Sequence, residues 1–285
     1  MFVPRKILEE KLLKLLAEDV GQGDATSDAV IPSGLEATAE VIAKANGVVA
    51  GIEEATVLAE ALGLKVNAAV ADGSTVKSGQ VFMQIHGDAK TILAVERTLL
   101  NVVSRMSGIA TATRDLTEKL RKANLPPKIA ATRKTAPGLL FFDKKAVVIG
   151  GGDAHRMHLD DMVLIKDNHV ALAGSLEEAI HRAKQHVSFS TKIEVEVENP
   201  QDALKAAELG ADIVMLDNFS PQQAKEAVAL LKKGGFFGRV LLEASGGITP
   251  ENLFEFASAG VDVISLGELT HSVKALDLSL EIAKA

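Results

Sequence analysis

The chain has 285 residues, of which 47% are hydrophobic, so it can fill a substantial core and disorder is excluded. It has 38 acidic residues against 31 Lys and Arg, a formal net charge of −7, which argues against a general nucleic-acid or membrane-surface binder. It contains no Cys, which excludes disulfides, thiolate zinc sites and cysteine nucleophiles. It also lacks a signal-peptide pattern and an apolar run of the roughly 20 residues that span a membrane. We therefore predict a cytoplasmic protein.

The N-terminal part combines helix and strand signals. Residues 3–20 carry apolar side chains at helical spacing, at positions 7, 8, 12, 13, 15 and 16. Up to about residue 105, strand-like runs are broken by Asn-Gly, Asp-Gly and Ser-Gly, which are turn and hairpin signals. We predict an N-terminal α+β domain over 1–105, joined by a C-terminal helix over 270–285.

A long helical segment over 89–123 links this domain to the rest of the chain. Gly108 lies inside the segment. Because glycine weakens a helix, we expect a break at Gly108.

From residue 128 onward, short apolar runs alternate with amphipathic segments. We predict six strands, over 128–132, 161–165, 192–197, 212–216, 239–244 and 262–266. Of the helices between them, one begins after Ser175 as a plausible N-cap and another has Pro200 at its start. This alternation predicts right-handed β-α-β units and a parallel sheet. Six to eight such units favour closure into a barrel, which we place over 106–269.

The candidate site residues follow the predicted strands, because parallel α/β folds place their sites at the carboxyl ends of the strands. Cations and neutral donors come after the first two strands, carboxylates in or after the next two, and glycine turns after the last two. They are Thr132, Arg133, Lys134, His155, Arg156, Lys166 and His169, then Glu194, Glu196, Glu198 and Asp217, and finally Ser245, Gly246, Gly247, Gly267 and Glu268.

Each group has a plainer interpretation as a solvated face, a strand edge or an ordinary turn. Glu194 and Glu196 alternate with apolar residues, so in a closed barrel both point inward, where charge is costly unless it is paired or functional. Glycine turns after the last two strands of a β/α barrel form a recurrent phosphate site. His155, His158 and His169 lack a fourth ligand and a helical HExxH spacing, so we predict no metal-ligating side chains.

Two anion sites with carboxylates between them suit a reaction in which positive charge develops, or one in which Mg²⁺ travels with a diphosphate. A ribosyl centre with oxocarbenium character meets both conditions. The interpretation from residues alone ends there.

Eight motifs, in order along the chain, resemble the quinolinate phosphoribosyltransferase family: "GDATSD", "ERTLLNVVSRMSGIATAT", "TRKTAPGL", "KKAVVIGGGDAHRMHLDDMVLIKDNH", "EVEVEN", "VMLDNF", "LEASGGI" and "SLGELTHS". The resemblance implies an α/β fold, with an N-terminal α+β sandwich followed by an incomplete, six- to seven-stranded parallel β/α barrel. It implies a homodimer whose active sites are completed across the interface. It also implies conversion of quinolinate and phosphoribosyl pyrophosphate, with Mg²⁺, to nicotinate mononucleotide, pyrophosphate and CO₂.

The same resemblance assigns roles to residues. Lys134, Lys166, Glu196 and Asp217 are the expected catalytic residues. The expected ligands of the quinolinate carboxylates are Arg133, Lys134, His155 and Arg156, beside Thr132, with Arg97 reaching in from the partner subunit. Lys166 sits between the substrate and pyrophosphate, and Glu196 and Asp217 face the ribose and its metal. The 5-phosphate falls to Ser245, Gly246, Gly247, Leu266, Gly267 and Glu268, with His271 nearby.

Two positions depart from the family pattern, and alternatives stay open. Leu140 stands where the family commonly has Arg, and Lys145 where it has an aromatic residue. The loss of a cation leaves room for a related member, such as the molybdenum-transport-associated branch, or for a non-catalytic anion-binding protein. A third alternative is an unrelated phosphate-handling barrel of the aldolase or thiamin-phosphate synthase type, for which Lys166 is the one positioned Schiff-base candidate.

Overall fold

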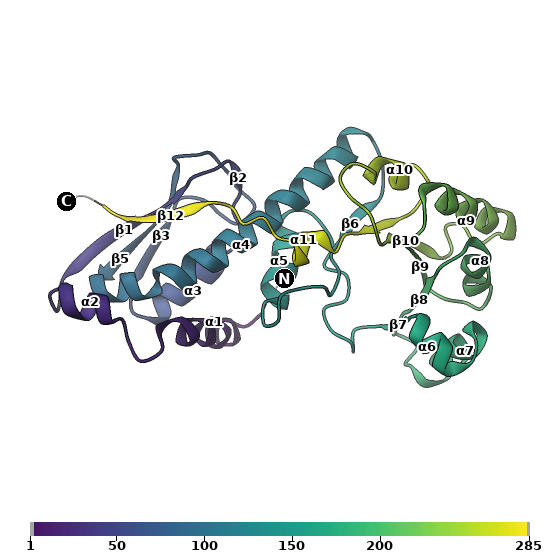
Figure 1. Cartoon of the computed structure of the whole chain (residues 1–285), viewed down its shortest axis with the longest axis horizontal. Coiled ribbons are helices and arrows are strands. Elements are labelled where there is room, and N and C mark those ends of the chain that lie inside the picture. Colours follow the sequence, from purple (N-terminus) through teal and green to yellow (C-terminus); the bar gives the residue numbers. More distant parts are fainter. Residues whose placement is uncertain (1–2, 284–285) are drawn as a thin grey trace. The chain divides into compact units, whose positions relative to one another are not determined.

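The computed structural model describes residues 3–283 and divides into two compact units, which are described separately (Figure 1). Unit 1 comprises residues 3–114, 141–151 and 273–283, and unit 2 comprises residues 115–140 and 152–272. Residues 1–2 and 284–285, at the ends of the expected N-terminal domain and C-terminal helix, lie outside the described residues.

Unit 1 is built on an antiparallel sheet in the order β12-β1-β5-β3, with a separate two-stranded sheet, β2-β4. Its strands are β1 (Glu36–Ala43), β2 (Gly47–Val48), β3 (Lys65–Ala68), β4 (Thr75–Val76), β5 (Val81–Asp88) and β12 (Leu278–Ile282). Its helices are α1 (Arg5–Val20), α2 (Ala25–Val30), α3 (Ile52–Ala61), α4 (Ala89–Lys122), whose last turns belong to unit 2, and α5 (Leu140–Ile149). The predicted mixture of strands and helices is confirmed.

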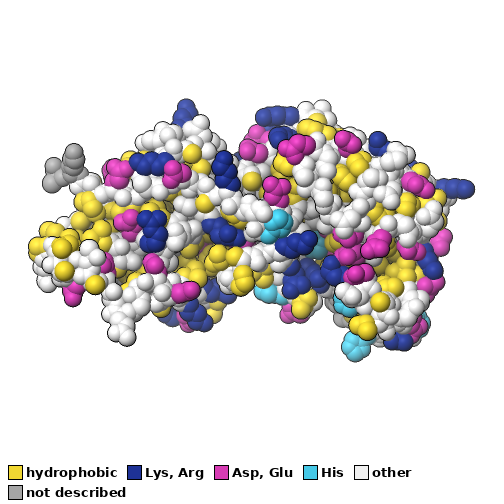
Figure 2. All heavy atoms as spheres, viewed as in Figure 1, with side chains coloured by type: hydrophobic (Ala, Val, Ile, Leu, Met, Phe, Trp, Pro, Cys, Tyr) yellow, Lys and Arg dark blue, Asp and Glu magenta, His cyan; other side chains and the backbone are white. Residues whose placement is uncertain are grey.

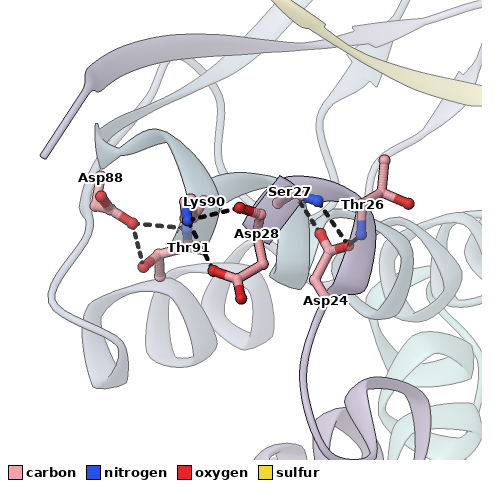
Figure 3. Close-up of polar contacts among 7 residues, drawn as sticks. All are labelled: Asp24, Thr26, Ser27, Asp28, Asp88, Lys90 and Thr91. Atoms are coloured by element: carbon pink, nitrogen blue, oxygen red, sulfur yellow. Dashed lines mark hydrogen bonds and ion pairs between the residues drawn. The ribbon is translucent and has the colours of Figure 1, made fainter. Parts of the chain in front are cut away.

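Local capping explains where two helices of unit 1 begin, including the one in the "GDATSD" motif (Figure 3). Asp24 is the N-cap of α2, and its Oδ1 accepts the backbone N–H of Ser27 at 3.1 Å. Asp28 on α2 pairs with Lys90 Nζ at 2.8 Å, which ties α2 to the start of α4. Asp88 accepts from the first turn of α4. The motif therefore fixes the local structure of unit 1.

The break expected at Gly108 is wrong, because α4 runs without interruption through this residue. Gly108 instead allows close backbone packing against α4. A Cβ there would lie 2.2 Å from the backbone oxygen of Lys274 and 2.8 Å from Cα of Ala275. The missing side chain therefore lets the C-terminal segment pass directly over the helix.

The helix expected over 270–285 is also wrong within the described residues. The short helix α11 (Glu268–His271) ends at the start of this segment, and β12 follows. β12 extends the edge of the sheet by pairing antiparallel with β1, with Leu280 opposite Val41. Backbone hydrogen bonding to a free strand edge has overridden the helical composition of the segment.

Unit 2 contains a six-stranded sheet in the order β6-β11-β10-β9-β8-β7, and its neighbouring strands all pair in parallel. Its strands are β6 (Lys128–Ala130), β7 (Val163–Ile165), β8 (Ile193–Val197), β9 (Ile213–Asp217), β10 (Leu241–Ser245) and β11 (Val263–Ser265). All six predicted strands are confirmed. β6 and β7 are the two ends of the strand order, so the barrel is incomplete, as the resemblance implied.

Helices connect the parallel strands of unit 2 (Figure 1). They are α6 (Asp167–Ala173), α7 (Leu176–His186), α8 (Pro200–Glu208), α9 (Pro221–Gly234) and α10 (Leu253–Ala257), and α11 follows the last strand, β11. Ser175 caps α7 by accepting the N–H of Glu178, and Pro200 is the first residue of α8, as predicted. A continuous apolar core, which includes Val195, Val214 and Leu242 of the strands, packs between the sheet and these helices. Among the described residues, no helix is both long and apolar enough to cross a lipid bilayer.

Candidate functional site

A cavity of about 270 Å³ lies in unit 2 at the carboxyl ends of its strands. It is lined by Ala131, Thr132, Arg133, Lys134, His155, Arg156, Leu164, Lys166, Glu196, Met215, Asp217, Glu243, Ser245 and Ser265. Every strand of the six-stranded sheet contributes to this lining or is followed by a residue that does. The position agrees with the rule that parallel α/β folds bind ligands at this edge.

The cationic side of the cavity comes from the ends of β6 and β7 and from the loop between them. Arg133 and Lys134 follow β6, and Arg156 belongs to the segment that an isolated bridge between Ala130 and Asp153 holds beside β6. No ion pair within residues 3–283 involves Arg133 or Lys134. These two side chains are therefore available to an anion.

Lys166 lies directly after β7, as the N-cap of α6. Its backbone N–H donates to Nδ1 of His169 at 2.9 Å, so His169 orients the helix start rather than lining this cavity. The ammonium of Lys166 forms an ion pair with Glu196. Arg133, Arg156, Lys166 and His169 also border a second cavity of about 450 Å³. The cations thus lie between two cavities.

The carboxylate side of the cavity comes from β8 and β9. Glu196 on β8 and Asp217 at the end of β9 both line the cavity. Burial and the neighbouring charge of Glu196 raise the pKa of Asp217, while Lys166 and Lys134 act in the opposite direction. Asn218 donates from Nδ2 to Oδ2 of Asp217 at 2.7 Å. Two close carboxylates therefore face the cations across one cavity.

The glycine turns lie at the ends of β10 and β11. Gly246 has φ of +86°, and a Cβ at this position would lie 2.3 Å from Oδ1 of Asn218. A Cβ on Gly267 would meet the ring of His271 at 2.9 Å and the side chain of Lys134 at 3.3 Å. Both positions thus need glycine because other site groups approach closely. Of the predicted phosphate residues, Ser245 lines the cavity, whereas Gly246, Gly247, Leu266, Gly267, Glu268 and His271 are outside its lining.

A buried cluster lies against the cavity, formed by His155, Glu194 on β8 and Glu243 on β10. Nε2 of His155 lies 3.0 Å from Oε2 of Glu243 and 3.4 Å from Oε2 of Glu194. Although burial opposes it, contact with the two carboxylates raises the pKa of His155 by favouring a proton on Nε2. The N–H of Arg156, which donates to Nδ1 of the ring at 2.7 Å, disfavours a proton there. Burial raises the pKa of Glu194. Contact with His155 lowers this pKa, and the negative charge of Glu243 raises it further.

The ligand atoms of this cluster lie within 4.8 Å of one another, as do those of the exposed trio His158, Asp160 and Asp161. In the buried cluster, Nδ1 of His155 accepts a hydrogen bond, so the ring proton is on Nε2. In the described structure the cluster is a buried network of one imidazole and two carboxylates.

Sequence reasoning missed Glu243 and Ser265, and it ranked Glu194 below Glu196. Except in the strand over 192–197, the candidates were residues that follow a strand, whereas Glu243 lies inside β10. Glu243 and Ser245 are two positions apart, and residues at this spacing share one face of a strand. That alternation was the available signal. Arg97, the remaining predicted residue, lies on α4 in unit 1, with its side chain exposed and 3.8 Å from Glu96.

Comparisons with known proteins match nearly the whole chain to one family. A family model of the quinolinate phosphoribosyl transferase N-terminal domain matches residues 24–107, and a model of the C-terminal domain matches residues 109–281. The chain is 48% identical over 269 residues to a probable nicotinate-nucleotide pyrophosphorylase (carboxylating) of Methanothermobacter thermautotrophicus, which covers 94% of this chain and 96% of the relative. It is 40% identical over 300 residues to a mitochondrial quinolinate phosphoribosyltransferase (decarboxylating) 2 of Nicotiana glauca, covering 98% and 83%.

Solved structures give the same result. A nicotinate-nucleotide pyrophosphorylase from Francisella tularensis superimposes with a TM-score of 0.89 at 34% identity, covering 99% of this chain and 98% of that one. The corresponding protein of Ehrlichia chaffeensis has a TM-score of 0.89 at 32% identity, covering 99% and 100%. The similarity therefore extends over both units.

Proposed function

Because the chain belongs to the quinolinate phosphoribosyltransferase family, we propose that it transfers the phosphoribosyl group of phosphoribosyl pyrophosphate to quinolinate. The carboxyl group next to the ring nitrogen leaves as CO₂, and the products are nicotinate mononucleotide and pyrophosphate. The enzyme is a pentosyltransferase of NAD biosynthesis. The observation that carries the proposal is the cavity of unit 2, where the cations Arg133, Lys134 and Arg156 face the carboxylates Glu196 and Asp217.

The cationic side of the cavity suits a dicarboxylate. Arg133, Lys134 and Arg156 offer more charged donors than one carboxylate can accept, and Thr132 and His155 border the same space. A second carboxylate on the ligand engages the surplus donors. Quinolinate carries two carboxylates on adjacent ring carbons, so it satisfies this side of the cavity better than a monocarboxylate does.

The carboxylate side suits the transfer step. When pyrophosphate leaves, positive charge develops at the ribosyl carbon, and fixed anions stabilise this charge more than they stabilise the ground state. Glu196 and Asp217 line the cavity together with the buried Glu243, and Lys166 pairs with Glu196. We assign Glu196 and Asp217 to the ribosyl centre. Lys134 and Lys166 then stand between the ring and the departing pyrophosphate.

The glycine turns after β10 and β11 suit the 5-phosphate. Backbone N–H groups without side-chain cover can approach an anion closely. Ser245 lines the cavity directly ahead of the turn at Gly246 and Gly247, and Gly267 lies at the end of the neighbouring strand. We assign the phosphate to these turns, with Leu266, Glu268 and His271 beside it.

Mg²⁺ is the expected companion of phosphoribosyl pyrophosphate. The donor set fits, because Glu196 and Asp217 offer oxygen acceptors to a hydrated hard cation that is carried by phosphates. When bound, Mg²⁺ neutralises charge on the leaving pyrophosphate. The side chains then have to orient the ribose and the hydrated ion.

We further propose a homodimer in which Arg97 serves the cavity of the partner subunit. Its side chain is exposed on α4 of unit 1, whereas the cavity belongs to unit 2. Mixing an Arg97→Ala chain with a Lys134→Ala chain tests this role. We expect about a quarter to a half of the sites to regain activity after subunit exchange, because one intact site forms in each mixed dimer. If verified mixed dimers recover no activity, the assignment is contradicted.

Incubation with quinolinate, phosphoribosyl pyrophosphate and Mg²⁺ tests the main proposal. We expect nicotinate mononucleotide, pyrophosphate and CO₂ in equal amounts. Binding of both substrates without turnover would favour a non-catalytic anion-binding protein. An aldolase role is disfavoured, since Schiff-base chemistry needs an uncharged lysine and Lys166 is held in an ion pair with Glu196.

Two further expectations complete the proposal. Figure 2 shows Lys and Arg side chains interspersed with Asp and Glu over the face in view, which is unlike the continuous basic surface of a nucleic-acid binder. The cytoplasmic location stays a prediction from the sequence.

A further inference from the structure

Two buried carboxylates beneath the cavity of unit 2 have too few hydrogen-bond donors. Glu194 on β8 is 0% exposed, and Glu243 on β10 is 2% exposed. Within residues 3–283, both oxygens of Glu194 and Oε1 of Glu243 have no hydrogen-bond partner. Because burying a carboxylate destabilises a fold unless the charge is fully paired, stability alone does not explain this pair.

His155 faces both carboxylates at once. Its Nε2 lies 3.0 Å from Glu243 Oε2 and 3.4 Å from Glu194 Oε2. Its Nδ1 accepts the backbone N–H of Arg156 at 2.7 Å. These contacts assign the ring proton to Nε2, where it is directed at the two acceptors. The carboxylates therefore fix both the tautomer and the orientation of the ring.

The ring of His155 in turn fixes the chain at Arg156. His155 has φ of 52°, in the left-handed region, and its own N–H donates to Asp153 Oδ1 at 2.8 Å. Asp153 is held beside β6 through the bridge to Ala130. The segment is thus anchored to β6 at one end and to the ring at the other. The side chain of Arg156 extends from this anchored segment into the cavity lining.

Charge supports the same arrangement. Burial and the nearby charge of Arg133 lower the pKa of Arg156, whereas the charge of Glu194 raises it. Two guanidinium groups that face one cavity repel each other until an anionic ligand enters. Glu194 offsets part of this repulsion from below the cavity.

We propose that Glu194 and Glu243 are positioning residues, which hold the His155 ring by Nε2 and thereby place Arg156 to receive a carboxylate of the pyridine substrate. The inference rests on the proposed function, since it assigns these residues to the quinolinate end of that cavity. They act through His155 and Arg156, and of the two only Glu243 also belongs to the cavity lining.

The proposal is tested with Glu194→Gln and Glu243→Gln, singly and together. The matched control for the loss of one negative charge is Glu226→Gln, on the exposed face of α9. We expect KM for quinolinate to rise about tenfold in each single variant, with KM for phosphoribosyl pyrophosphate changed less than about twofold. The melting temperature should stay the same or rise, because a buried charge is removed. The control should behave as the wild type.

A structural role would have a different signature. If the glutamates only held the barrel together, the melting temperature would fall and both KM values would stay near those of the wild type. That result overturns the proposal, as does a quinolinate KM within about twofold of the wild type in the double variant.

A second measurement separates this inference from the proposed function. In protein with ¹⁵N-labelled histidine, a His155→Gln variant identifies the His155 ring signals. We expect a protonated Nε2 and an unprotonated Nδ1 in the wild type, and loss of this fixed tautomer in the double variant. Unchanged ring signals overturn the inference whether or not the wild type is active. A wild type that does not convert quinolinate, with ring signals that respond as expected, overturns the proposed function alone.

Discussion

The two units bury charge in different ways. In unit 1, Arg105 donates from Nε and Nη2 to both oxygens of Asp143, at 2.7 and 2.8 Å, and Asp143 is fully buried. In unit 2, Glu194 and Glu243 share one imidazole N–H. The buried carboxylate of unit 1 is thus matched by donors, whereas those of unit 2 are not.

A second cluster of unit 1 is also ion-paired, although Oε2 of Glu54 has no hydrogen-bond partner among the described residues. Lys145 on α5 forms ion pairs with Glu53 and with the fully buried Glu54 on α3. This pairing explains how a lysine is accommodated at a position where the sequence departs from its family. In unit 2, by contrast, Arg133 and Lys134 border the cavity without a carboxylate partner among the described residues. Buried charges that are paired with one another hold a unit together, and charges left open around a cavity are available to a ligand.

The largest expected effect is on the stability of unit 1. Lys145→Met keeps the apolar stem but leaves Glu54 buried without its cation, and we expect a loss of about 3 to 5 kcal/mol in the free energy of unfolding. Lys145→Met/Glu54→Leu should recover most of this loss, since an apolar pair replaces the ion pair. Urea unfolding of both variants measures the effect, and kcat of the folded fraction should be unchanged. A stable single variant with reduced kcat would place this cluster in the active machinery and break the comparison.

The next effect is on catalysis in unit 2. Glu196→Gln or Asp217→Asn should lower kcat by roughly 10²-fold or more, because a fixed anion at the developing positive charge is removed. The affinity for quinolinate should change less. Single-turnover rates and melting temperatures are to be measured on the same preparations. A lower melting temperature with an unchanged kcat would mean that these carboxylates are structural partners of Lys166.

Selectivity for a dicarboxylate gives a smaller but still measurable effect. Nicotinate leaves part of the cationic side unpaired, so we expect it to bind at least about tenfold more weakly than quinolinate. Arg133→Met should reduce this preference, because it removes an unpaired cation. Competition binding measures both ligands. Equal affinities in the wild type would contradict the dicarboxylate assignment.

The pH dependence of stability sharpens the view of unit 1. Burial opposes it, but contacts with Glu53 and Glu54 raise the pKa of Lys145 in the folded state. The stabilisation is therefore fully present below the unfolded pKa of about 10.4 and is lost as the pH rises through the higher folded pKa. We expect the wild type to lose more stability than Lys145→Met/Glu54→Leu as the pH rises from 9.5 to 11.5. Parallel stability curves for the two proteins would refute this origin.

The strands and most of the residues that line the cavity could be predicted from the sequence, because both follow from local patterns. Six apolar runs at regular spacing predict a parallel sheet, and that topology alone brings Arg133, Lys166, Glu196 and Asp217 to one edge. Glu243 was missed because its position inside β10 hides it from a search of strand ends.

The features that failed depend on distant contacts. The continuity of α4 at Gly108 depends on the passage of residues 274–275, which no local pattern reveals. The C-terminal strand did carry a signal, since Leu278, Leu280 and Ile282 alternate with polar residues at the period of a strand.

The smallest expected effect concerns Leu140, where the sequence resemblance led us to expect Arg. Leu140 is the first residue of α5 and is absent from the lining of the cavity of unit 2. Arg133, Lys134 and Arg156 already supply that cavity with more donors than one carboxylate can accept, so an added cation has no unmatched acceptor to engage. We expect Leu140→Arg to change KM for quinolinate by less than about threefold, within the range of an exposed charge pair. Steady-state kinetics with Leu140→Gln as the uncharged control measures it. A tenfold fall in KM for the Arg variant alone would show that the cationic side of the cavity is incomplete in this chain. The contrast between charges that are paired within the protein and charges that are available to a ligand would then extend to α5.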